Sequence, residues 1–289
     1  MKTAKIKLIS SMFIFGTIGI FVKYIDMPSS VIATVRGALG ALFLLLLVTV
    51  ERQKMSFKDI KNNLLVLFAS GACIGVNWIL LFEAYRYTTV ATATLCYYMA
   101  PVFVVIVSPL LLKERLTLKK SLCVCLAIIG MVLVSGVLSG NNSANAKGII
   151  FGLLAATAYA SVIVLNKYLK NLSAFDMTIM QLGIATIVIL PYTLITENIS
   201  TIAADERTII LLVVVGIVHT GITYALYFSS MQDLKAQTVA IFSYIDPAMA
   251  IILSATILRE GMDIFGIIGA VLILGSTFFS EITDKKENA

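Results

Sequence analysis

The sequence is poor in charged residues and in the side chains that build metal and disulfide sites. Only 13% of its 289 residues are charged, and 59% are hydrophobic, whereas soluble domains have about 25% charged residues. The chain has a single histidine, and its four cysteines all lie inside apolar runs: Cys73, Cys96, Cys123 and Cys125. This composition excludes an ordinary soluble protein, and the cysteines indicate neither a disulfide nor a metal site.

Signatures of catalysis are missing as well. The sequence contains no His-x-x-x-His pair, no Gly-x-Ser-x-Gly turn and no Walker-type phosphate loop. We therefore expect no enzyme, no cofactor and no metal. The net charge of +6 does not indicate nucleic-acid binding, because the basic residues stand in short stretches between apolar runs, as membrane topology requires.

Long apolar runs are what the sequence does have. A membrane-spanning helix needs roughly 20 apolar residues. Ten windows meet or approach this length: residues 8–25, 29–50, 63–85, 90–112, 121–138, 148–169, 175–195, 208–230, 236–258 and 263–281. The sequence therefore predicts an all-α integral membrane protein with ten transmembrane helices. The first run has no Ala-x-Ala cleavage site and is expected to be retained as a helix.

The distribution of lysine and arginine predicts the orientation. Most of these residues in the loops fall on the side that holds both termini, and cytoplasmic loops carry the excess of positive charge. We expect a multi-pass protein of the cytoplasmic membrane with both termini in the cytoplasm. The lipid bilayer is thus one expected partner.

The chain also repeats itself. Residues 91–114 and 237–260 can be aligned. Their matching positions are Tyr98 with Tyr244, Pro101 with Pro247, and Lys113-Glu114 with Arg259-Glu260. An odd number of spans in each unit forces the second unit to enter the membrane upside down. We therefore predict two inverted five-helix repeats, residues 1–139 and 148–289, joined by a connector at 140–147.

These features resemble the EamA-type transporters of the drug/metabolite transporter superfamily over essentially the whole chain. The resemblance rests on the repeat, on Arg36-Gly37 after the first loop, and on a mid-helix proline and a terminal glutamate in each unit. It implies a helical bundle around a central cavity, alternating access, and movement of small metabolites, often outward.

The inverted repeat and the rare ionisable side chains inside the apolar runs predict a secondary transporter, an exporter of amino acids or related compounds, for which proton coupling is one option. A carrier of choline-like or polyamine cations is the alternative, and a membrane enzyme or lipid-handling scaffold is a third reading. The protein would work as a monomer or a homodimer.

Ionisable side chains inside apolar runs are the first candidates for a functional site, because each costs about 2.5–3.5 kcal/mol on insertion scales. Asp246 lies near the middle of its run beside Pro247, which cannot donate a backbone hydrogen bond, so a cation or proton site is expected there. The alternative is an aspartate that caps the broken helix or pairs with a neighbouring helix. His219 could exchange protons with Asp246 or serve only as hydrogen-bonded structure.

Arg36 and Glu83 are predicted to form a structural ion pair. Binding of a substrate carboxylate by Arg36 or Lys23 is the alternative. Aromatic and amide side chains are predicted to line the cavity: Asn77, Trp78, Phe82, Tyr98, Tyr159, Tyr224 and Tyr244. Such a wall suits an amphipathic or cationic small molecule. Tyr85 lies near a helix end and is interpreted as an interfacial anchor.

Overall fold

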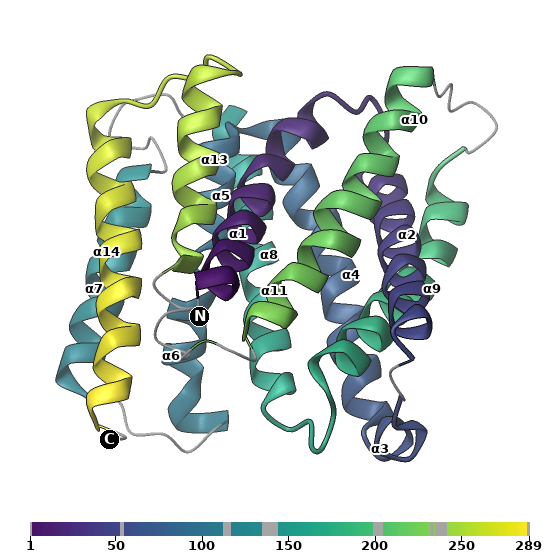
Figure 1. Cartoon of the computed structure of the whole chain (residues 1–289). Coiled ribbons are helices and arrows are strands. Elements are labelled where there is room, and N and C mark those ends of the chain that lie inside the picture. Colours follow the sequence, from purple (N-terminus) through teal and green to yellow (C-terminus); the bar gives the residue numbers. More distant parts are fainter. Residues whose placement is uncertain are drawn as a thin grey trace.

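The computed structural model of the chain describes residues 2–52, 55–111, 117–134, 144–198, 205–231, 234 and 242–287. Every long element in these ranges is a helix (Figure 1). In chain order they are α1 (Lys2–Lys23), α2 (Ser29–Val50), α3 (Phe57–Asn62), α4 (Leu64–Tyr87), α5 (Val90–Tyr97), α6 (Ala100–Leu111), α7 (Leu118–Val134), α8 (Ala144–Asn166), α9 (Ala174–Thr196), α10 (Glu206–Val213), the π-helix η3 (Val214–Ile222), α11 (Thr223–Met231), α13 (Ile245–Thr256) and α14 (Ile264–Glu287).

The helices form a membrane protein. Seven spans in the described ranges are long and apolar enough to cross a bilayer, and shorter apolar helices cover 245–256 and 264–279. Large apolar side chains such as Leu65 and Ile195 are more than four-fifths exposed, at 83% and 84%, which suits lipid better than water. The prediction of an all-α membrane protein is therefore confirmed, whereas the arrangement as ten helices in inverted repeats stays a prediction.

The two predicted prolines mark helix starts. Helix α5 ends at Tyr97 and α6 begins at Ala100, so Pro101 lies in the first turn of α6, where a missing backbone N–H costs little. Pro247 also lies in the first turn of its helix, as the third residue of α13, which begins at Ile245. The span at 90–111 is therefore interrupted just before its proline. The residues 235–241 that precede α13, and Glu114, lie outside the described residues.

A second interruption was not predicted. The window 208–230 is divided into α10, the π-helix η3 and α11. The hydroxyl groups of Thr220 and Thr223 donate to carbonyl oxygens five residues earlier, on Val215 at 3.0 Å and Val218 at 2.6 Å. These bonds follow the wider spacing of a π-helix, a local feature that is frequent at functional sites.

Helix ends are capped by side chains close to both faces of the bundle. Ser173 accepts a hydrogen bond from the backbone N–H of Asp176 at the start of α9, and Asp205 accepts one from Thr208 at the start of α10. Hydrogen bonding to Thr208 also lowers the pKa of the Asp205 carboxyl. Helix α8 already begins at Ala144, so the last part of the predicted connector is helical, and residues 140–143 lie outside the described ones.

Close helix packing places α1 at the centre. Helices α7 and α14 lie side by side at one edge (Figure 1), where an ideal Cβ on Gly130 would stand only 2.8 Å from the carbonyl oxygen of Gly269. Helix α1 packs on α13 and on α11, and α2 packs on α9 and η3. We call the end of the bundle that holds Lys23 and Glu260, the upper end in Figure 1, the Lys23 end.

Candidate functional site

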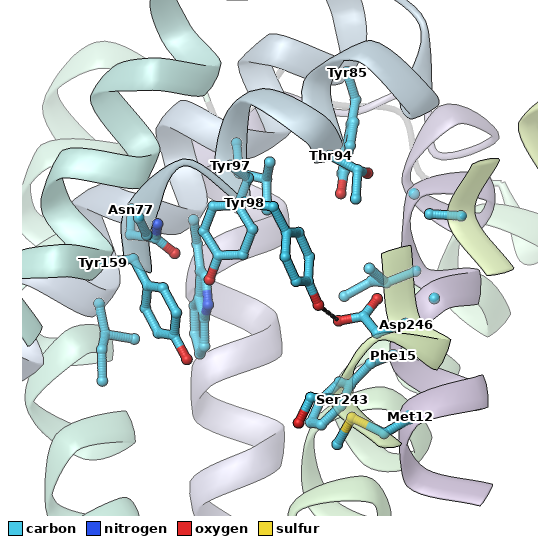
Figure 2. Close-up of a pocket in the computed structure, with 18 of the residues that line it drawn as sticks. Met12, Phe15, Asn77, Tyr85, Thr94, Tyr97, Tyr98, Tyr159, Ser243 and Asp246 are labelled. Carbon is cyan, nitrogen blue, oxygen red and sulfur yellow. Dashed lines mark hydrogen bonds between the residues drawn. The ribbon is translucent and has the colours of Figure 1, made fainter. Parts of the chain in front are cut away.

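A cavity of about 330 Å³ lies inside the bundle, lined by α1, α2, α4, α5, α6, α8, α11 and α13. Its volume is at the small end of the range for small-molecule sites, about 300–1,000 Å³. Aromatic rings make up much of its wall: Phe15, Trp78, Tyr85, Tyr97, Tyr98, Tyr159, Tyr224 and Tyr227. Figure 2 shows several of these rings around the charged group of Asp246.

Asp246 faces this cavity from the first turn of α13. The hydroxyl of Tyr98 donates a hydrogen bond of 2.9 Å to its carboxylate, as the dashed line in Figure 2 marks. Gly16 brings α1 against the same turn, because an ideal Cβ there would lie 2.6 Å from the carbonyl oxygen of Asp246 and 2.7 Å from the Cβ of Met249. The bond thus joins Tyr98, which directly follows α5, to α13 at the cavity wall.

Arg36 is the other charged side chain that lines the cavity. Its Nε donates to the hydroxyl of Thr220 at 2.8 Å, and its guanidinium carbon lies 4.2 Å from the centre of the Trp78 ring. This stacking is a cation–π contact. Thr220 binds the Nε of the guanidinium and Trp78 packs on its face, so the remaining N–H groups can donate hydrogen bonds to a bound anion.

The predicted ion pair between Arg36 and Glu83 is not formed. Oε1 of Glu83 instead lies 3.3 Å from Nη1 of Arg86, which is in the next turn of the same helix. Helix α4 turns Trp78 and Phe82 toward Arg36, and the next residue points about 100° away around an α-helix. The arginine is therefore stabilised by aromatic rings and a hydroxyl rather than by a carboxylate.

Lys23, predicted as an alternative carboxylate binder, pairs with Glu260. Its Nζ lies 3.0 Å from one Glu260 oxygen and donates to the carbonyl of Thr88 at 3.2 Å. The other Glu260 oxygen accepts bonds from the backbone N–H of Val90 at 2.8 Å and from the hydroxyl of Ser254 at 2.6 Å. The alignment singled out Glu260 as a repeated residue, but its role at this junction was not predicted.

His219 lies behind α1 and does not line the cavity. Its Nε2 forms a hydrogen bond of 2.8 Å with the hydroxyl of Thr17, and its ring packs on Phe21 at 4.6 Å between centroids. Since Gly16 of α1 faces Asp246 while Thr17 faces His219, helix α1 separates the two ionisable groups. Proton exchange between them stays a prediction that no described contact supports.

The other predicted residues divide into two groups. Asn77, Trp78, Tyr159, Tyr224 and Pro101 line the cavity. Asn77 also donates a hydrogen bond of 2.7 Å to the carbonyl of Ala155.

Three predicted residues fall outside the lining. Phe82 is fully buried behind Arg36, and Pro247 is buried within its helix. The Tyr244 ring packs edge-on against Phe278 of α14 at 5.3 Å. The symmetric role predicted for Tyr98 and Tyr244 is therefore wrong, because only the former turns into the cavity.

Several lining residues were missed. Tyr85 is only 4% exposed and lines the cavity rather than the membrane interface. Thr94 and Tyr97 also line it. With Tyr98 and Pro101 they follow the i, i+3, i+4, i+7 spacing of one helix face, and this pattern in the sequence could have found them.

An all-helical membrane bundle around a central cavity with charged and aromatic walls is compatible with a membrane transporter of small molecules. The model of the EamA-like transporter family matches the chain twice, over residues 3–136 and 146–281. The chain therefore belongs to the EamA-like transporter family.

Individual relatives agree with this assignment. The chain is 32% identical over 275 residues to the uncharacterized transporter YxxF of Bacillus subtilis (strain 168), covering 94% of this chain and 87% of the relative. It is 25% identical over 214 residues to protein PecM of Dickeya dadantii (strain 3937), covering 73% and 71%. A solved crystal structure with 15% identity superposes with a TM-score of 0.68 and covers 97% of this chain and 98% of that one, which supports the fold.

Proposed function

We propose that the protein is a secondary active transporter that moves small organic metabolites across the cytoplasmic membrane by alternating access. In this proposal the chain forms ten helices in two inverted repeats, both termini lie in the cytoplasm, and no step of chemical catalysis occurs. The twofold match to the family model supports two related halves. The central cavity between helices of both halves supplies the binding site.

Amino acids or closely related compounds are the proposed substrates. The observation that carries this proposal is the presence of Arg36 and Asp246 in one cavity. A guanidinium attracts a carboxylate and a carboxylate attracts an ammonium group, so a small dipolar molecule can satisfy both. The aromatic rings around them would cover its apolar part.

Export is the proposed direction. With the termini in the cytoplasm, the Lys23 end faces outward, and the contacts of Glu260 with Lys23, Val90 and Ser254 hold that end together. A carrier that is closed toward the outside can be loaded from the cytoplasm. A proton on Asp246 would compete with the ammonium group of a substrate, which is one way to couple the two fluxes.

Transport by purified protein in liposomes tests this function. Vesicles loaded with radiolabelled neutral amino acids, dicarboxylates, choline or putrescine are diluted into buffer with and without a pH gradient, and efflux is measured. Neutral amino acids should leave about 10- to 100-fold faster than from vesicles carrying Asp246→Asn protein. Flux that no pH gradient alters contradicts proton coupling, and a panel without any flux contradicts the proposed transport of these metabolites.

Organic cations are a second candidate substrate class. Asp246 with its ring of tyrosines would suit a choline-like or polyamine cation. Arg36 in the same cavity would repel such a cation, which favours dipolar substrates. Faster efflux of choline or putrescine than of amino acids would make organic cations the preferred substrate class.

A further inference from the structure

Thr94 carries a buried hydroxyl group that faces the cavity and makes no hydrogen bond of ordinary geometry, and the hydroxyl of Tyr85 lies beside it. The residue is 4% exposed and lines the cavity, and among the described residues its Oγ1 has no partner at hydrogen-bond distance and angle. Helical threonines elsewhere in the chain donate to the carbonyl one turn earlier, as Thr178 does to Ala174 at 2.8 Å and Thr186 does to Leu182 at 2.9 Å. An unpaired buried hydroxyl is costly, so this one is placed to meet a bound molecule.

Tyr85 brings a second hydroxyl group to the same place. Its ring descends from α4 beside Thr94 of α5, and both side chains are seen at the same part of the cavity wall in Figure 2. The phenol end of the ring has room because Gly19 of α1 has no side chain; an ideal Cβ there would lie 3.4 Å from the Tyr85 Cζ. Helices α1, α4 and α5 thus position the hydroxyl groups of Tyr85 and Thr94 toward the Lys23 end of the cavity.

The chemistry of this pair favours a neutral polar group. Each hydroxyl can both donate and accept a hydrogen bond, as a hydroxyl or carboxamide on a ligand also can. Lys23 and Glu260, two charged groups at this end, are paired with each other, with Nζ of Lys23 lying 3.0 Å from a carboxylate oxygen of Glu260. Asp246 accepts from Tyr98 and remains the group in the cavity that would attract a positive charge.

We propose that Tyr85 and Thr94 form a hydroxyl subsite that binds an uncharged hydrogen-bonding group, a hydroxyl or a carboxamide, on the side chain of the substrate. This inference rests on the proposed function, in which Arg36 and Asp246 hold the charged ends. A site that hydrogen-bonds a substrate hydroxyl discriminates strongly against the analogue that lacks it, because its own polar groups are then left unpaired. The protein therefore selects hydroxylated substrates over apolar ones of the same shape.

Two pairs of probes that differ in one polar group test the subsite: threonine with valine, and serine with alanine. Efflux from proteoliposomes is measured for each compound, and the ratio within each pair is the readout. The wild-type protein should favour the hydroxylated member by about tenfold. Thr94→Val keeps the shape of the side chain but removes the hydroxyl, and it should reduce the ratio toward one, while Thr94→Ser should retain it.

Two further variants separate binding from folding. Tyr85→Phe removes the other hydroxyl and should lower the same ratio, so the test stands even if Thr94→Val folds poorly. Thr178→Val is the matched control, because the hydroxyl of Thr178 is buried and bonded within its own helix. Any effect of Thr178→Val on efflux should be equal for both members of a pair, so that the ratio stays at its wild-type value.

The outcomes are distinct. Wild-type protein that moves both members of each pair equally, or variants at Thr94 and Tyr85 that keep the wild-type ratio, would overturn the subsite and leave the proposed function standing. Wild-type protein that moves none of the four amino acids would overturn the proposed function, and the subsite with it.

Discussion

The ammonium group of Lys23, the last residue of α1, lies 3.0 Å from a carboxylate oxygen of Glu260, which follows α13. The second oxygen of Glu260 accepts a hydrogen bond of 2.8 Å from Val90, the first residue of α5. One carboxylate thus ties three cavity-lining helices together at the Lys23 end. We therefore expect these contacts to separate when the cavity opens at this end.

Glu260→Gln should open the Lys23 end more often. Loss of a charged hydrogen-bonding group removes roughly 1–3 kcal/mol of preference for the closed arrangement, and about 1 kcal/mol corresponds to roughly a fivefold change in population. The measurement is the labelling rate of Thr94→Cys by a small membrane-impermeant thiosulfonate added outside, in protein whose four native cysteines are replaced. The rate should rise about fivefold or more.

The ion pair of Glu83 with Arg86 supplies the matched control. It also involves one carboxylate and one basic side chain, but both belong to α4 and join no other helix. Glu83→Gln should therefore leave the labelling rate unchanged. Equal rates in the Glu260→Gln and Glu83→Gln proteins would argue against a gate at Lys23.

A disulfide between α1 and α5 should lock the same end. An ideal Cβ on Gly19 lies 2.5 Å from Cγ1 of Val90, so cysteines at the two positions can reach disulfide geometry. Because a side chain at Gly19 also crowds Tyr85, flux is compared between the oxidised and the reduced form of the same Gly19→Cys, Val90→Cys protein, and the oxidised form should have the lower flux. Either single variant should be insensitive to oxidant, and full activity of the cross-linked protein would show that α1 and α5 need not separate.

The length of the apolar runs and the positions of the prolines were enough to predict a helical membrane protein, because both act within a single segment. Asp246 could be found in the same way, because an isolated carboxylate in an apolar run is costly and therefore indicates a functional site. The Tyr98 contact of Asp246 and the Glu260 contact of Lys23 depend on how distant helices rotate and meet, and no local pattern fixes that rotation. Tyr85 was misread for a related reason: closeness to a helix end indicates depth in the membrane but not which way the ring faces.

Asp246→Asn should reduce efflux of dipolar substrates by about 10- to 100-fold. The loss of a charge-assisted bond to an ammonium group, worth about 1.5–3 kcal/mol, accounts for this range. Tyr98→Phe keeps the carboxylate and removes only its 2.9 Å partner, so its effect should be smaller. Proteoliposome efflux measures both variants, and normal activity of Asp246→Asn would remove this residue from the site.

His219→Gln tests whether the histidine handles protons. Its ring is bonded to Thr17 and packed on Phe21, away from the cavity lining, and glutamine can keep the bond while losing the ability to titrate near neutral pH. The dependence of flux on a pH gradient should survive in His219→Gln. His219→Leu, which also removes the bond, should lower thermal stability. If His219→Gln alone abolishes the pH dependence, a relay through this residue is required despite the separation by α1.

Arg36 should determine whether a substrate carboxylate is accepted. Arg36→Gln removes the charge, and it should weaken transport of amino acids by about tenfold or more while favouring their neutral amine analogues, whose ammonium group is still attracted by Asp246. Arg36→Lys keeps the charge but loses the planar stack on Trp78, which lies 4.2 Å away, so it should give partial activity. Competition of each amino acid with its decarboxylated amine measures this preference directly. An unchanged preference in Arg36→Gln would assign Arg36 to packing with Trp78 and Thr220 rather than to the substrate.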